Sequence, residues 1–205
     1  MATLKNIIFD LGGVLLSIDY KKTANAFVNL GVEDFEKMYD QFSADDLFIK
    51  LETGHISQEY FFKQMQARIH SLTPESITAA WNAMVLNFRL ESLQFLEVLS
   101  KKYNLYLLSN TNVIHKENFD RLFTQETGRR SLDDYFIKAY YSHLIGFRKP
   151  NADIFTFVLK DADLNAGETL FIDDSSNNTE AAQELGIKTH LLLPDEKIEN
   201  LKLSI

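Results

Sequence analysis

The sequence predicts an α/β fold, a doubly wound parallel sheet interrupted by an inserted helical segment. Short apolar runs at residues 4–9 and 169–172 are typical of strands that are buried on both faces of a parallel sheet. From residue 105 onward, strand-like runs alternate with helical patterns, which indicates right-handed crossovers between parallel strands. Residues 19–103 show helical periodicity and no comparable strand.

The alternation predicts the order of the remaining core elements. Each expected strand is a short apolar run, and each expected helix has apolar residues at helical spacing. The strands are expected at residues 105–109, 137–141, 169–172 and 187–193, and the helices at residues 113–125, 152–160 and 179–185.

The long segment after the first strand is expected to form several helices. Ser57 and Thr73 suit helix N-caps, the latter with Pro74 at the first helical position. Gly31 and Gly54 stand where helices would end. Two apolar sets predict buried helical faces, namely Phe27, Leu30, Phe35, Met38 and Phe42, and Tyr60, Phe61, Met65 and Ile69.

These patterns predict two domains. Residues 1–16 and 91–205 would form the α/β core, and residues 17–90 would form a helical-bundle cap inserted into it. Trp81 is expected in the core of the bundle. The sequence has no internal repeat and no low-complexity segment.

Composition narrows the functional classes. The chain has 205 residues and no Cys, which excludes disulfides, thiolate nucleophiles and Cys-ligated zinc. Its formal net charge of -8 disfavours nucleic acid and anionic membranes as partners. No signal peptide or long apolar run is evident, so we expect a cytoplasmic protein. We also expect it to be a monomer or a weak dimer.

Carboxylates follow two of the expected strands. Asp10 ends the first apolar run, and Asp173 and Asp174 end the run that begins at residue 169. Parallel sheets bind ligands beyond the carboxyl ends of their strands, so we expect the three side chains to meet. Crowded carboxylates need a cation, most simply Mg2+, and an Asp beside Mg2+ suits aspartyl-phosphate chemistry.

Other polar residues stand at equivalent positions. Ser109 ends another strand, where it suits either a phosphate contact or a simple helix N-cap. Pro150 keeps Lys149 extended, so this lysine would project from a loop, as a phosphate ligand or as a solvated surface residue. Gly12 and Gly13 would allow a tight turn whose N–H groups approach an anion.

In this order, the strand Asp, strand Ser, loop Lys and strand Asp-Asp pair resemble the four motifs of the haloacid dehalogenase (HAD) superfamily. The helical insertion resembles the C1 cap of that superfamily, on a Rossmann-like core. Finer features resemble the subgroup of α-glucose-1-phosphate phosphatase-like proteins: the run 109–112 with His115, the run 148–150, and the run 171–174 with Asn178.

The resemblance implies an Mg2+-dependent phosphatase that hydrolyses a small phosphorylated metabolite, such as a sugar phosphate. Asp10 would be the nucleophile, Lys149 would neutralise it, and Ser109 would bind a phosphate oxygen. The other implied contacts are Asn110 and Gly13 for the substrate, and Asp10, Asp174, Asp173 and the Gly12 carbonyl group for the metal.

One position departs from the pattern of the superfamily. Most of its phosphatases have an Asp two residues after the nucleophile as general acid and base, and here that residue is Gly12. The substrate could have a good leaving group, such as an anomeric phosphate, or a cap residue such as His55 could supply the proton. The protein could also bind phosphorylated ligands without turnover. A 2-haloacid dehalogenase is a weaker alternative, because it would not need the Asp173-Asp174 pair.

Overall fold

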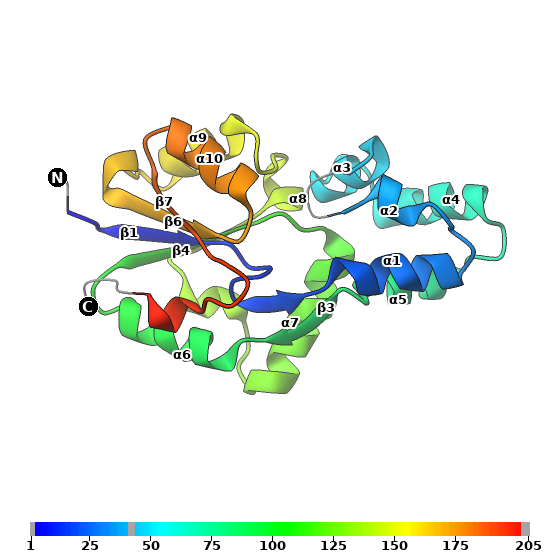
Figure 1. Ribbon diagram of the computed structural model, residues 1–205, viewed down its shortest axis with the longest axis horizontal. Coiled ribbons are helices and arrows are strands. Elements are labelled where there is room, and N and C mark those ends of the chain that lie inside the picture. The colour runs from blue at the N-terminus through cyan, green and yellow to red at the C-terminus, as the bar shows by residue number, and fades with distance from the viewer. Residues whose placement is uncertain (1–2, 41–43, 202–205) are drawn as a thin grey trace.

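A five-stranded parallel sheet forms the centre of the molecule, in the order β5-β4-β1-β6-β7 (Figure 1). The computed structural model describes residues 3–40 and 44–201. The fold class predicted from the sequence is confirmed, and each strand lies within two residues of its expected start. The strands are β1 (Asn6–Phe9), β4 (Asn104–Ser109), β5 (Lys138–Tyr141), β6 (Thr169–Asp173) and β7 (Lys188–Leu191).

Helices cover both faces of this sheet (Figure 1). Helices α6 (Leu90–Leu99) and α7 (Val113–Thr127) lie on one face, and α9 (Ala152–Asp161) and α10 (Ser176–Glu184) on the other. Successive residues of β1 alternate between the two layers, because side chains of a strand point to opposite faces. Short elements complete the core: α8 (Ser142–Ile145), η1 (Leu132–Tyr135), η2 (Ala166–Glu168) and η3 (Ile198–Asn200).

The inserted segment forms a second, aromatic core beside the sheet (Figure 1). Trp81 is fully buried there, as expected, against Phe35, Phe48 and Phe61. Tyr60 was expected on a buried helical face, but it is 50% exposed. Phe42, which was expected on the other buried face, lies outside the described residues. The helices are α1 (Tyr20–Asn29), α2 (Phe35–Met38), α3 (Asp46–Glu52), α4 (Gln58–Arg68) and α5 (Pro74–Asn82).

The expectation that residues 19–103 contain no strand is wrong. Strand β3 (Val85–Phe88) pairs antiparallel with β2 (Leu16–Ile18). Strands this short carry little periodic signal, and this pair depends on the two ends of the insertion coming together. The pairing joins the chain entering the helical segment to the chain leaving it. In the described part of the chain, no helix has the length and apolar character required to cross a membrane.

Candidate active site

Three carboxylates meet at the carboxyl ends of β1 and β6. Asp10 follows β1, Asp173 is the last residue of β6, and Asp174 comes next. One carboxylate oxygen from each residue lies within 4.8 Å of the others. The Asp10 N–H donates to the Ile172 carbonyl oxygen at 2.9 Å, which extends the pairing of β1 and β6 to Asp10. The structure therefore brings together side chains from opposite ends of the sequence.

Lys149 lies between two of these carboxylates. Its Nζ atom is 2.8 Å from Asp10 Oδ1 and 2.6 Å from Asp173 Oδ2, and its side chain is only 1% exposed. Burial disfavours the charged ammonium group, but the two carboxylates outweigh this effect, so the pKa of Lys149 lies above its ordinary value. Lys149 is therefore a buried cation of the site, and the alternative of a solvated surface lysine is wrong.

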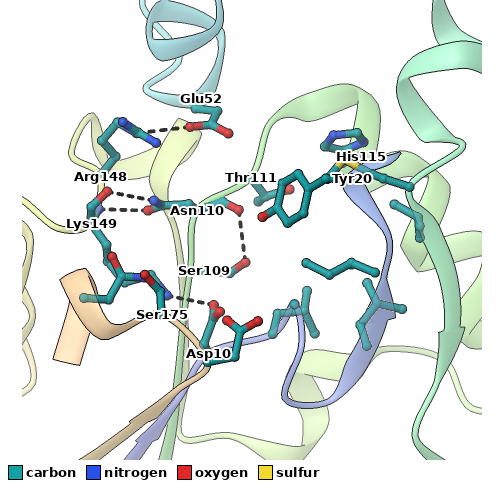
Figure 2. A pocket seen from close by; sticks show the side chains of 18 of the residues that line it. Asp10, Tyr20, Glu52, Ser109, Asn110, Thr111, His115, Arg148, Lys149 and Ser175 are labelled. Atoms are coloured by element: carbon teal, nitrogen blue, oxygen red, sulfur yellow. Dashed lines mark hydrogen bonds and ion pairs between the residues drawn. The ribbon is translucent and has the colours of Figure 1, made fainter. Parts of the chain in front are cut away.

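The side chain of Asn110 holds the backbone of Lys149. Asn110 Nδ2 donates to the Lys149 carbonyl oxygen at 2.9 Å, and the Lys149 N–H donates to Asn110 Oδ1 at 2.8 Å. Both ends of the amide group are thus used to connect the loop before α9 to the end of β4 (Figure 2). The sequence suggested that Asn110 contacts the substrate, whereas the structure gives it the position of a support for Lys149.

Asp173 is held by its surroundings at both oxygens. The Ser175 N–H donates to Oδ1 at 2.8 Å, and Asn178 Nδ2 lies 3.1 Å from Oδ1 and 3.0 Å from Oδ2. Together with the bond from Lys149, these contacts occupy the carboxylate of Asp173. Asp173 therefore fits the supporting role better than the role of a direct metal ligand.

The electrostatics of the carboxylates fit a divalent cation. Burial raises the pKa of Asp10 to about 8, since the attraction of Lys149 offsets only part of the desolvation, and Asp173 and Asp174 add repulsion. Burial and the adjacent Asp173 raise the pKa of Asp174 to about 6. A cation held by oxygen ligands would relieve this repulsion, and Mg2+ prefers such ligands. The residues present therefore fit Mg2+.

Gly13 allows the loop after β1 to approach Asp174. It has a φ of +70°, and a Cβ atom there would lie 2.1 Å from Asp174 Oδ2. The Gly13 N–H donates to the Leu16 carbonyl oxygen at 2.8 Å, so this N–H is engaged within the loop. The contact of Gly13 with the substrate stays a prediction, and its N–H is used within the loop. The glycine is required because the carboxylate passes directly over it.

Ser109 ends β4 near Asp10. Its side chain is buried, and its hydroxyl group lies 3.4 Å from the Asn110 carbonyl oxygen. Figure 2 shows the Ser109 hydroxyl and the Asp10 carboxylate on the same side of the pocket. Asn112, and not Ser109, caps α7, since its Oδ1 atom accepts from the His115 N–H at 3.1 Å. This leaves the Ser109 hydroxyl available for a phosphate oxygen.

A cavity of about 120 Å³ lies above these residues, and the helical segment forms its opposite wall. Tyr20, Tyr39 and Glu52 form part of that wall, and Arg148 lines the cavity from the side of the core. Figure 2 labels Tyr20, Glu52 and Arg148. Tyr20, Tyr39 and Glu52 were not predicted, because each lies at or next to the end of a helix without a local motif and only the packing of the insertion places it here. Arg148 was noted only as part of the run 148–150, without a place in this wall.

His55 does not occupy the position suggested for it. Within the described residues it is exposed, outside the cavity that contains Asp10, and its Nδ1 atom lies 2.6 Å from Thr53 Oγ1. The turn between α3 and α4 faces the core through Gly54, where a Cβ atom would lie 2.1 Å from the His143 carbonyl oxygen. His55 is therefore unsuited to supply the missing proton.

His115 joins the core to the helical segment. Its ring stacks on Trp81 with centroids 4.7 Å apart, and its Nδ1 atom is 2.9 Å from Asn82 Oδ1. Burial lowers the pKa of His115 to about 3, so the imidazole is neutral at physiological pH. The stacking on Trp81 and the contact with Asn82 therefore connect α7 of the core to α5 of the helical segment.

Comparison with known proteins places this site in a family. Residues 4–186 match the profile of the haloacid dehalogenase-like hydrolases. The chain is 37% identical over 188 residues to D-ribitol-5-phosphate phosphatase of Bacteroides thetaiotaomicron, covering 91% of this chain and 90% of that protein. The protein therefore belongs to the haloacid dehalogenase-like hydrolases, and the resemblance seen in its motifs is confirmed.

Solved structures support the same assignment. A HAD family enzyme from Bacteroides thetaiotaomicron, determined with magnesium and inorganic phosphate, superimposes with a TM-score of 0.85 and 34% sequence identity. That match covers 98% of this chain and 100% of the other. A predicted HAD-like hydrolase from Porphyromonas gingivalis gives a TM-score of 0.86 at 34% identity, covering 95% of this chain and 94% of the other.

Proposed function

We propose that the protein is an Mg2+-dependent phosphatase that hydrolyses a small polyol or sugar phosphate through an aspartyl-phosphate on Asp10. The observation that carries the proposal is the arrangement of the buried Asp10 and Lys149 with the half-buried Asp174 at the base of a cavity that polar and apolar side chains line. The relative that acts on D-ribitol 5-phosphate supports the substrate class.

Each residue of the site has a defined part in the reaction. A carboxylate oxygen of Asp10 attacks phosphorus, the bond to the leaving oxygen breaks, and water then cleaves the aspartyl-phosphate to release inorganic phosphate. Lys149 and the Ser109 hydroxyl neutralise and bind the phosphoryl oxygens. Asp10, Asp174 and the Gly12 carbonyl group would hold Mg2+, which supplies positive charge next to the phosphoryl group when it is bound.

No acidic side chain stands at Gly12 to protonate the leaving oxygen. Tyr20 lines the cavity, and burial, together with the charges of Asp174 and Glu52, raises its pKa well above the ordinary value. Its phenol therefore stays protonated at neutral pH and is suited to donate a hydrogen bond, whereas it is a weak acid for complete proton transfer.

The function is tested by phosphate release from a panel of esters. We expect turnover of D-ribitol 5-phosphate, other polyol and sugar phosphates and 4-nitrophenyl phosphate with Mg2+, and a loss of at least about 100-fold in EDTA. Saturable binding of the same esters without turnover would favour the binding-only alternative. Halide release from a 2-haloacid in EDTA would favour the dehalogenase.

An acidic side chain at position 12 is expected to increase kcat for esters with poor leaving groups. In Gly12→Asp the new Cβ atom would lie 2.9 Å from the Cδ1 atom of Ile18, the mobile end of that side chain, so Ile18→Val is added to make room. General acid catalysis is worth about 100- to 10,000-fold. We therefore expect kcat for an alkyl phosphate to rise at least about 10-fold relative to 4-nitrophenyl phosphate.

The matched control for this experiment is Ile18→Val alone, which enlarges the cavity without adding an acid. The measured quantity is the ratio of kcat for the alkyl ester to kcat for the aryl ester, since the aryl leaving group needs little protonation. An unchanged ratio in the double variant would contradict the view that the missing acid limits turnover of poor leaving groups.

A further inference from the structure

We propose that Glu52 and Arg148 form a subsite that binds adjacent hydroxyl groups of the leaving group and selects polyol or sugar esters over hydroxyl-free esters. The inference rests on the proposed function, because it takes the phosphoryl group to be held at Asp10 and Lys149. It assigns the recognition of the leaving group to one acidic and one basic side chain.

The two side chains come from the two parts of the molecule. Glu52 is the last residue of α3 and is 2% exposed, and Arg148 lies in the core loop before α9. Both line the cavity that contains Asp10, and Figure 2 shows them next to each other, joined by a dashed line at one end of the pocket. Arg148 directly precedes Lys149, and consecutive Cα atoms are ~3.8 Å apart. The pair therefore borders the same cavity as Asp10 and Lys149, where a leaving group would lie.

The pair has unused hydrogen-bonding capacity. Arg148 Nε lies 3.1 Å from Glu52 Oε2, yet both atoms are buried and neither makes a hydrogen bond with the described residues. Glu52 Oε1, in contrast, accepts from the Tyr39 hydroxyl group at 2.8 Å. Buried polar atoms without a hydrogen bond are rare in folded proteins, and each one calls for an explanation, such as a water molecule or an ion. Tyr39 thus fixes one oxygen of the carboxylate, and the other oxygen is ion-paired with Arg148 without a well-aligned hydrogen bond, so a hydroxyl group of a ligand would complete the hydrogen bonding of both.

The chemistry of the pair matches a diol. A carboxylate oxygen only accepts hydrogen bonds and a guanidinium group only donates them, whereas a hydroxyl group does both. Two adjacent hydroxyl groups could donate to Glu52 and accept from Arg148 at the same time. The opposite charges of the pair cancel, so a neutral hydroxylated chain fits better than a second anionic group. Sites built for hydroxyl groups discriminate strongly against analogues that lack them.

The pair could instead act only as a connection that holds the helical segment against the core. Gly54, two residues after Glu52, already packs on the backbone of His143. A structural connection would affect all substrates to the same extent, whereas a hydroxyl subsite affects only substrates with hydroxyl groups. The test therefore measures a preference between two esters.

The experiment compares D-ribitol 5-phosphate with n-pentyl phosphate, which has the same chain length and no hydroxyl groups. In Glu52→Gln and Arg148→Lys we expect the ratio of kcat/KM for the two esters to fall about 10- to 100-fold. Arg68→Gln is the control, since Arg68 pairs with Asp45 at 3.4 Å outside this cavity. Its ratio should remain that of the wild type. Equal losses for both esters in the Glu52 and Arg148 variants would overturn the proposal.

Binding to the Asp10→Asn variant separates this proposal from the proposed function. Titration of the two phosphates in Mg2+ measures the preference without turnover, and we expect Glu52→Gln on that background to reduce it by a similar factor. A wild type without phosphatase activity that still shows this preference would reject the function and retain the subsite. Equal affinity for the two esters in the parent variant would reject the subsite.

Discussion

Replacement of Asp10 with Asn is expected to lower kcat for every phosphate ester by at least about 10,000-fold. The amide is close in size to the carboxylate, but it is a poor nucleophile and forms no aspartyl-phosphate. Asp10 lies 2.8 Å from the Nζ atom of Lys149, and one of its carboxylate oxygens lies within 4.8 Å of a carboxylate oxygen of Asp174. Its side chain is therefore next to both the cation and another carboxylate of the site. Steady-state phosphate release with Mg2+ measures the effect.

The control for this variant is Asp46→Asn, which removes an exposed carboxylate that pairs with Lys50 on the surface of the helical segment. Its kcat should stay within about threefold of the wild type, because surface ion pairs contribute little. Circular dichroism should show a native fold for both variants. Phosphatase activity in Asp10→Asn close to that of the control would exclude Asp10 as the nucleophile.

The sequence was sufficient to predict which core residues meet. Asp10, Ser109 and Asp173 each end a short apolar run, and runs of this kind form parallel strands whose carboxyl ends share one edge of the sheet. Pro150 indicated only that Lys149 projects from a loop, and it was the resemblance to the superfamily that implied a place beside Asp10. Local patterns therefore determined the base of the site, including the convergence of residues far apart in the sequence.

The upper wall of the site could not be predicted in this way. Glu52 ends an amphipathic helix, and its local sequence does not distinguish it from a solvated acid. Its burial depends on how α3 packs around Trp81 and on the path that β2 and β3 impose on the insertion. The helical or strand periodicity of a sequence predicts local elements, but it does not predict where a side chain lies in the tertiary structure. Of the two residues proposed to bind the leaving group, Arg148 therefore belongs to a motif seen in the sequence, whereas Glu52 has no such motif.

Two residues have contacts that the sequence did not predict. Gly13 was expected to contact the substrate, and in the structure its N–H donates to the Leu16 carbonyl group while the glycine makes room for Asp174. Asn110 was also expected to contact the substrate, and it lines the cavity while its amide holds the backbone of Lys149. In both cases residue type indicated a role in the site, and the partner depended on side-chain geometry that only the structure contains.

Replacement of Lys149 with Met is expected to reduce both stability and activity. The ammonium group is buried between Asp10 and Asp173, and its removal leaves buried carboxylates without their cation. Breaking a buried ion pair in this way costs about 3–5 kcal/mol. We expect this loss in the free energy of unfolding, measured with urea in EDTA at pH 8, and a fall in kcat of at least about 1,000-fold because the phosphoryl charge loses a fixed partner.

The pH dependence and a matched variant give this prediction its control. The pKa of Asp10 is raised to about 8 and that of Asp174 to about 6, so both folded-state values lie above those of the unfolded chain. Protonation below these values favours the folded state, so the loss in Lys149→Met should be smaller at pH 6 than at pH 8. Lys138→Met removes a half-exposed lysine that lies 2.6 Å from Asp161 and should cost less than about 1 kcal/mol. Equal losses in the two lysine variants at pH 8 would contradict the role of Lys149 as the buried counter-charge of the carboxylates.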